Sequence, residues 1–136
     1  MLKPKKTKYR KHQKGTLKNN RKSVFFTNTL KEGILRLDST QSARISSKQL
    51  ESCRQSITRR IKRVGKLQIK AFPDWSITKK PTEVRMGKGK GAIDFWVCKV
   101  KPGMTVFEIS GAERSTSIKA LKSAASKLPI QVRIVG

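Results

Sequence analysis

Acidic residues and histidine are scarce in this chain, and their scarcity argues against an enzyme. The 136 residues include 8 Asp and Glu and a single histidine, His12. General acid–base catalysis needs paired carboxylates or a histidine with an orienting partner, and a two-metal nuclease needs clustered carboxylates. Here the acids are scattered. We therefore expect no catalytic site, metal site, cofactor or small-molecule substrate, and a small basic nuclease is the least favoured hypothesis.

Long apolar runs and paired cysteines are also missing. No apolar stretch is long enough to cross a bilayer, and no apolar segment of a secretory signal follows Met1. Cys53 and Cys98 lie far apart, at no spacing typical of a metal site. We expect both thiols to be free and buried in the core, as suits a reducing compartment, and we expect no membrane partner.

Positive charge, by contrast, is abundant. The 33 Lys and Arg residues give a formal net charge of +25 and a pI near 11. Self-repulsion of this size destabilises a compact fold unless a polyanion neutralises it. The composition therefore indicates a phosphate-rich partner, with nucleic acid as the leading candidate.

The N-terminal segment is the most basic part of the chain. Residues 1–22 contain ten Lys or Arg and no acid. A block of like charge is usually disordered alone and binds nucleic acid as an arm; a solvated tail is the alternative. We assign residues 1–22 to a basic arm and 23–136 to a single folded domain. The arm's RNA-binding candidates are Lys3, Lys5, Lys6, Lys8, Tyr9, Arg10, Lys11, His12 and Lys14.

The folded domain combines strand and helix patterns. Strand-forming residues recur at 23–30, 33–37, 66–72, 93–100, 105–110 and 130–135. The 93–100 strand is apolar on nearly both faces, so we expect it to be buried. Residues 105–110 follow the Pro102-Gly103 turn and are expected to be its antiparallel partner.

Two stretches have helical spacing. Ser46 and Gln49 match a capping box, and we expect the helix that follows to end at Gly65. Its apolar face comprises Leu50, Cys53, Ile57, Ile61 and Val64. Its other face carries cations without an acid among them and is a second RNA-binding candidate: Arg54, Arg59, Arg60, Lys62 and Arg63.

The second helix is expected over residues 115–128, with Pro129 ending it. Its inward side chains are Ile118, Leu121, Ala125 and Leu128. Together these elements predict an α+β fold, a two-layer sandwich in which two helices cover one face of a mostly antiparallel sheet.

A glycine-rich stretch, RMGKGKG, suits neither a helix nor a strand. Its spacing formally matches a dinucleotide fingerprint, but an apolar strand follows it where a helix is needed, and it has no Gly-Lys-Ser/Thr ending. A plain connection is the alternative. In so basic a chain we expect bare backbone and lysines that approach phosphates, with Arg85 gripping a phosphate or stacking on a base. The loop comprises Arg85, Met86, Gly87, Lys88, Gly89, Lys90 and Gly91.

Several blocks of sequence resemble the family of large-subunit ribosomal protein sixteen, of the bacterial and organellar type. They are MLKPKKTKYRKHQKG, GKLQIKAFPDWSITKKPTEVRMGKGKG, DFWVCKVKPG, FEISG and AASKLPI, and the resemblance covers nearly the whole chain. It implies a non-catalytic constituent of the large ribosomal subunit, among neighbouring ribosomal proteins. The arm would thread into ribosomal RNA, and the glycine loop would reach toward tRNA near the peptidyl transferase region.

The compartment is inferred from composition. The 22 Lys outnumber the 11 Arg, and Ser and Asn are abundant, as in genes rich in A and T. The chain also starts at the family's own Met-Leu, without a transit peptide. We therefore expect an organelle-encoded protein of a mitochondrial ribosome, in the organelle matrix; a plastid or a bacterial cytoplasmic ribosome is the alternative.

A basic architectural DNA-binding protein is the alternative function. It would have the same electrostatic character, but we find no recognition helix after a tight turn and no zinc or zipper pattern.

Overall fold

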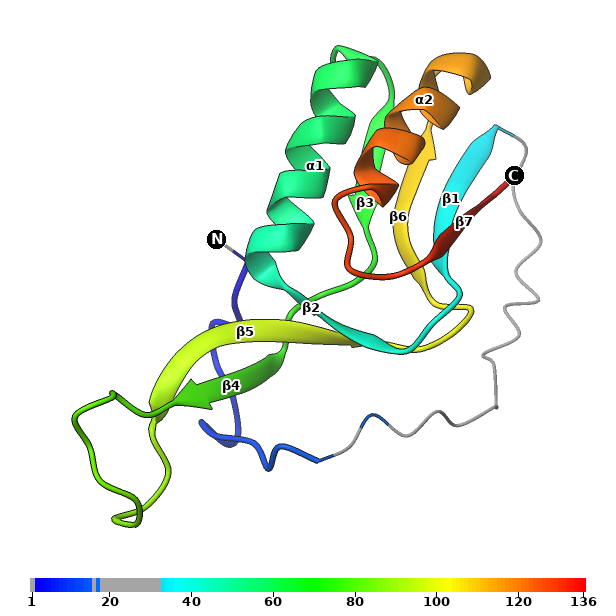
Figure 1. Ribbon diagram of the computed structural model, residues 1–136. Helices are drawn as coiled ribbons and strands as arrows, with labels where there is room; N and C mark the ends of the chain where they lie inside the picture. The colour runs from blue at the N-terminus through cyan, green and yellow to red at the C-terminus, as the bar shows by residue number, and fades with distance from the viewer. Residues whose placement is uncertain (1, 16, 18–32) are drawn as a thin grey trace.

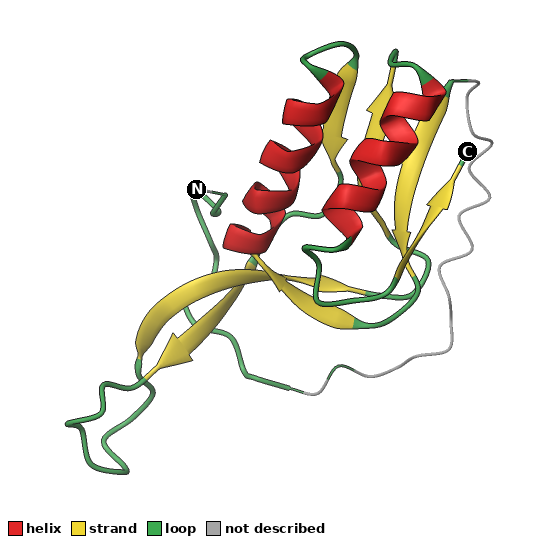
Figure 2. Ribbon diagram, turned by 45° about the horizontal axis from the view of Figure 1, so that its top comes forward, coloured by secondary structure: helices red, strands yellow, loops and turns green. Residues whose placement is uncertain are grey.

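The computed structural model describes residues 2–15, 17 and 33–136. Its main sheet has four antiparallel strands in the order β3 (Lys66–Ile69), β6 (Thr105–Ser110), β1 (Ile34–Ser39) and β7 (Val132–Val135). Helices α1 (Ser47–Ile61) and α2 (Arg114–Ala125) lie side by side on one face of this sheet (Figures 1 and 2). The α+β architecture predicted from the sequence is confirmed.

A second sheet extends from the helical layer. Its three antiparallel strands are ordered β2 (Ala43–Ser46), β5 (Ala92–Val100) and β4 (Trp75–Lys79). Strands β4 and β5 form a long hairpin that projects away from the helices, and the loop that connects them contains the glycine-rich stretch (Figure 1). The sheet therefore carries this loop well outside the core.

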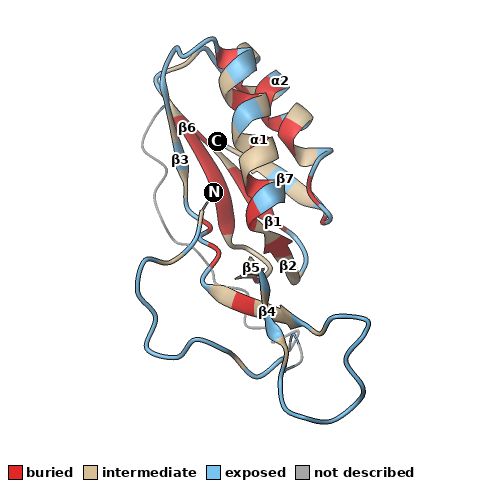
Figure 3. Ribbon diagram, turned by 90° about the vertical axis from the view of Figure 1, so that its left-hand side faces the viewer, coloured by how far each residue is buried: buried red, intermediate tan, exposed pale blue. Residues whose placement is uncertain are grey.

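The core lies between the helices and the main sheet. Phe107 and Leu37 of the sheet, Leu50 and Ile57 of α1 and Leu121 of α2 are fully buried. Figure 3 shows buried segments on β6, β1 and the helices, and exposed backbone along the arm and the hairpin loop. Each such side chain contributes about 1.5–3 kcal/mol to folding, so stability is concentrated away from the hairpin.

Helix α1 begins as the sequence predicts. The Ser46 hydroxyl accepts from the Gln49 amide at 3.2 Å, and the Gln49 side chain accepts from the Ser46 amide at 2.8 Å. Leu50, Cys53, Ile57 and Ile61 are buried as expected.

The end of α1 was predicted wrongly. The left-handed turn comes at Lys62 and Arg63, with φ of 49° and 65°, so the helix stops at Ile61 and Val64 is exposed. Gly65, with φ of 83°, lies instead in the turn that leads to β3. A Cβ there would lie 2.5 Å from the carbonyl oxygen of Ser110.

Helix α2 ends at Ala125 and not at Leu128, so Pro129 does not end it. Leu121 and Leu128 are buried as predicted, but the rest of the buried face differs from the prediction. Ser117, Ala120, Leu121 and Ala124 are its buried residues, whereas Ile118 and Ala125 are only partly buried. The reason is the contact with α1, where the Cys53 thiol reaches the Ala124 carbonyl at 3.5 Å. Small side chains let the two helices approach closely, so they occupy the interface in place of larger neighbours.

Three strand predictions need correction. Strands β2 and β4 were not predicted, because one is very short and the other follows Pro73-Asp74, a turn signal. The outer half of β5 is largely exposed, and Phe95 is 38% accessible. Strand β6 pairs with β1 and β3 rather than β5, since the Gly103 amide donates to the Ser39 carbonyl at 2.7 Å and directs the chain into the other sheet.

Other expectations meet different outcomes. Residues 23–30, predicted as a strand, lie outside the described residues. Both cysteines are free and buried, and burial raises the pKa of each thiol to about 11. None of the helices in the described part of the chain is long and apolar enough to span a membrane.

One buried carboxylate anchors the main sheet. Glu108 of β6 contacts Arg36 Nε at 2.9 Å and Lys70 Nζ at 2.8 Å, and its side chain is 11% exposed. Burial alone would raise the pKa of Glu108, but hydrogen bonds from Lys70 and Arg36 outweigh it and the pKa is lowered. The ionised form therefore stabilises the fold.

This lowered pKa predicts a loss of stability in acid. The contribution is complete above the ordinary glutamate pKa of about 4.3 and disappears as the pH falls through the lower folded value. At neutral pH, Glu108→Gln should reduce the free energy of unfolding by roughly 3 kcal/mol, because Arg36 loses its buried partner. Urea unfolding at several pH values should show the two proteins converging below about pH 4. Parallel profiles would contradict this role.

Candidate nucleic-acid interface

The arm is held against the second sheet by an aromatic stack. The His12 ring lies on Trp75 of β4 with centroids 4.3 Å apart and an angle of 26° between planes. His12 Nδ1 is 3.0 Å from the Ser76 hydroxyl, which in turn donates to the Arg10 carbonyl at 3.1 Å. A ring and a hydroxyl of β4 thus fix the middle of the arm.

Cations complete this contact. Lys99 Nζ of β5 lies 3.0 Å from the centroid of the Trp75 ring, a cation–π contact. Burial lowers the pKa of Lys99, and the nearby Arg44 guanidinium lowers it further. Arg44 of β2 donates to the carbonyls of Lys14 and Gly15 at 2.8 and 2.7 Å. The second sheet therefore holds the arm by hydrogen bonds to carbonyl oxygens of the arm's backbone.

The arm and the glycine loop are joined directly. Lys11 Nζ donates to the Lys90 carbonyl at 2.9 Å, and Lys90 Nζ donates to the His12 carbonyl. At the other end of the arm, Leu2 packs against the hydrophobic core. Leu2 and the segment 10–15 are therefore docked in the structure, although the sequence indicated an arm that is disordered alone. Aromatic and carbonyl contacts replace the apolar core that the arm lacks.

The glycine loop is bare and left-handed. Gly87, Lys88 and Gly89 have φ of 94°, 52° and 84°, and the Met86 side chain is 99% exposed. Lys80 Nζ donates to the Gly87 carbonyl at 2.6 Å. A Cβ at Gly91 would collide with the Lys79 carbonyl oxygen, so glycine is needed where the loop returns to β5. The backbone of residues 87–89 is open to an incoming partner.

The outer face of α1 is less cationic than predicted. Arg54 is paired with Glu51, one turn earlier, at 2.6 Å, and this hydrogen bond lowers the pKa of Glu51. An acid therefore does lie on this face. Arg59, Arg60, Lys62 and Arg63 remain exposed. The end of α1 that carries them points away from the hairpin loop (Figure 1), so they form a separate surface.

The structure thus brings some predicted residues together and separates others. His12 and Lys14 of the arm lie against the second sheet, and Lys11 and His12 contact the loop at Lys90. The other arm candidates are exposed: Lys3, Lys5, Lys6, Lys8, Tyr9 and Arg10. Among residues 2–15, 17 and 33–136, no group of three or more His, Cys, Asp and Glu side chains is placed to hold a metal ion.

Four residues that position the arm were not found from sequence: Arg44, Trp75, Ser76 and Lys99. Trp75 and Ser76 lie in the block GKLQIKAFPDWSITKKPTEVRMGKGKG, which indicated the family but no contact of these two residues with the arm. Nothing in the local pattern indicates that a segment more than sixty residues earlier stacks on this tryptophan.

Comparison with known proteins identifies the family of this chain. A family model described as ribosomal protein L16p/L10e matches residues 4–135. The chain belongs to this family. It is 48% identical over 135 residues to the large ribosomal subunit protein uL16 of Maricaulis maris, and 47% identical to that of Cereibacter sphaeroides. Each alignment covers 99% of this chain and 96% of the relative. The resemblance inferred from the sequence blocks is confirmed.

The stack on Trp75 predicts that His12 controls how firmly the arm is docked. His12→Ala should remove about 0.5–1.5 kcal/mol of docking free energy, which corresponds to about 2- to 12-fold faster cleavage of the arm by trypsin. The melting temperature of the domain should change little, because the core is untouched.

The matched control is Tyr9→Ala, since Tyr9 is 66% exposed in the same arm. Its cleavage rate should equal that of the parent protein. If both variants were cleaved at the parental rate, the stack would contribute nothing to docking.

Proposed function

We propose that this chain is a non-catalytic structural constituent of the large ribosomal subunit. Its relatives carry the name of a protein of that subunit. The observation that supports the role most directly is the pair of hydrogen bonds that join arm and loop through Lys11, His12 and Lys90, which places two lysine-rich segments side by side on one surface. Such a surface suits ribosomal RNA, whose A-form helices are recognised mainly by shape and phosphate contacts.

The proposal divides the RNA contacts among three segments. Residues 1–22 act as the arm, residues 23–136 as the domain that carries it, and the exposed end of α1 as a second phosphate-binding surface. The exposed cations of the arm and of α1 lie on different sides of the domain, so the protein can bridge separate RNA segments. Neighbouring ribosomal proteins complete its surroundings.

The glycine loop is proposed to lie near aminoacyl-tRNA in the peptidyl transferase region. Its backbone from Gly87 to Gly89 is left-handed, and no atom beyond the neighbouring residues lies within 4 Å of where a Cβ of Gly87 or Gly89 would be. Lys88 and Arg85 flank this backbone with positive charge. The loop can therefore approach a phosphate closely while favouring it electrostatically.

A DNA-binding role has no support in this geometry. Both described helices lie on the main sheet (Figure 1), and strands β3 to β6 separate them in the chain. Neither is presented after a tight turn as a recognition helix.

We also propose a mitochondrial ribosome as the location, on the composition of the chain. Its 22 Lys against 11 Arg support an organelle-encoded gene. The relatives named above are bacterial, and plastid and bacterial ribosomes are the alternatives. Fractionation of cells into organelles before ribosome purification separates the three.

The central experiment is affinity purification of the tagged chain, followed by sedimentation. It should comigrate with large subunits in stoichiometric amount and resist low-salt washing. If it were instead found with chromatin or free of ribosomes, the proposed function would be wrong.

The role of the loop is tested with Lys88→Glu. Lys90 is unsuitable because its ammonium donates a hydrogen bond to the His12 carbonyl. Lys88→Glu should change the free energy of unfolding by less than about 0.5 kcal/mol, and the variant should still enter subunits. Those subunits should bind aminoacyl-tRNA more weakly, since the new charge faces phosphate.

The matched control is Lys101→Glu, an exposed lysine in the turn after β5. It makes the same charge change outside the loop and should leave tRNA binding unaltered. Normal binding by subunits that contain the Lys88 variant would show that the loop is only a connection.

A further inference from the structure

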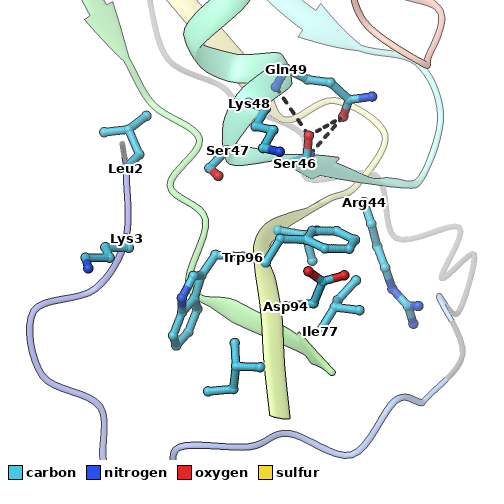
Figure 4. A pocket seen from close by; sticks show the side chains of 13 residues that line it. Leu2, Lys3, Arg44, Ser46, Ser47, Lys48, Gln49, Ile77, Asp94 and Trp96 are labelled. Carbon is cyan, nitrogen blue, oxygen red and sulfur yellow. Dashed lines mark hydrogen bonds between the residues drawn. The ribbon is translucent and has the colours of Figure 1, made fainter. Parts of the chain in front are cut away.

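A hollow of about 860 Å³ lies where the first turn of α1 meets the hairpin and the start of the arm (Figure 4). The arm–loop surface described above does not use it. Its lining combines apolar side chains of β4 and β5 with the cations Lys3, Arg44 and Lys48. One carboxylate, Asp94, is also in the lining.

Part of the lining is an apolar pair, Phe95 and Ile77. Phe95 of β5 lies directly across from Ile77 of β4 in the antiparallel register. Phe95 is 38% exposed. Covering its remaining apolar surface would be favourable. An aromatic face beside an aliphatic side chain, open on one side, is a surface on which a nucleobase can stack.

The wall of the hollow supplies donors for an anion. One terminal nitrogen of Arg44 donates to the carbonyls of both Lys14 and Gly15, and these hydrogen bonds fix the position of the guanidinium. Its Nε is buried and has no acceptor among the described residues. A buried donor without an acceptor destabilises the fold. An acceptor oxygen from a ligand would remove this cost.

The first turn of α1 adds to this wall. The capping box satisfies the amides of Ser46 and Gln49, which leaves those of Ser47 and Lys48 without an intrahelical acceptor. Both residues line the hollow, and the first turn contains no acid. The positive end of the helix dipole therefore faces the same space as the Lys48 side chain and Arg44.

We propose that this hollow binds a single unstacked nucleotide of RNA. The base lies on Phe95 and Ile77, and its phosphate is held by Arg44 and Lys48. The Asp94 carboxylate can accept a hydrogen bond from an N–H group of the base. Three lining cations against one acid, in a chain of net charge +25, favour a phosphate-bearing occupant over a segment of protein. This inference rests on the proposed binding of RNA and adds a specific nucleotide site to it.

The test compares oligouridine with an abasic ribose-phosphate strand of the same length and charge, each binding the full chain. The parent protein should prefer oligouridine, because only that strand can stack. Phe95→Ala should weaken oligouridine binding at least about fivefold and leave the abasic strand unaffected. Lys48→Gln should weaken both strands by the same factor, since it removes a phosphate contact.

Two controls keep the result specific. Phe72→Ala removes a phenylalanine that is 47% exposed outside the hollow, and it should bind both strands like the parent. Phe95→Leu keeps an apolar side chain on the hairpin but removes the aromatic face, so it should repeat the selective loss with the hairpin intact.

The outcomes separate this site from the ribosomal role. Equal binding of the two strands by the parent, or a loss at Phe95 no greater than at Phe72, would overturn the nucleotide site even if the chain enters large subunits. A selective loss at Phe95 in a chain that never enters large subunits would support the site and overturn the ribosomal role.

Discussion

Uncompensated positive charge is the constraint on which this structure depends. The chain carries 33 Lys and Arg against 8 acids, and among the described residues three salt bridges are formed. Two of them share one carboxylate, Glu108, inside the main sheet. Glu108 is one of two buried acids among the described residues, and most cations of the described chain form no salt bridge.

Carbonyl oxygens and aromatic rings are the partners of several of these cations. Lys11, Arg44, Lys80 and Lys90 donate to backbone carbonyls, and Lys99 lies over Trp75. These contacts are weaker than buried ion pairs but leave the net charge intact. They hold the arm and the hairpin loop in one arrangement, so less conformational freedom has to be lost when RNA binds. An acid at the same positions would hold the arm equally well and would reduce the attraction for phosphate.

Local patterns in the sequence were sufficient for part of this account. The capping box at Ser46 and the spacing of Leu50, Cys53 and Ile57 depend only on near neighbours, and α1 follows them. The sheet pairings depend on distant residues. Because β5 ends at a turn bonded to Ser39, a local hairpin signal at Pro102-Gly103 gave the wrong partner. The phase of α2 depended on how closely α1 approaches, and the stack of His12 on Trp75 joins segments with no shared local signal. The basic arm and the glycine loop were identified from composition, whereas their union required the three-dimensional structure.

The central claim is that the exposed Lys and Arg side chains of this protein bind RNA phosphates. The most direct test is the salt dependence of its binding to large-subunit ribosomal RNA. If the arm, loop and outer face of α1 all contact phosphate, a plot of log affinity against log salt concentration should be steep, with about 0.7–0.9 units of slope for each contact. Neutralising Arg59 and Arg60 together should reduce the slope by about two such contacts. A shallow slope that these substitutions leave unchanged would contradict the account, because binding would then rest on something other than charge.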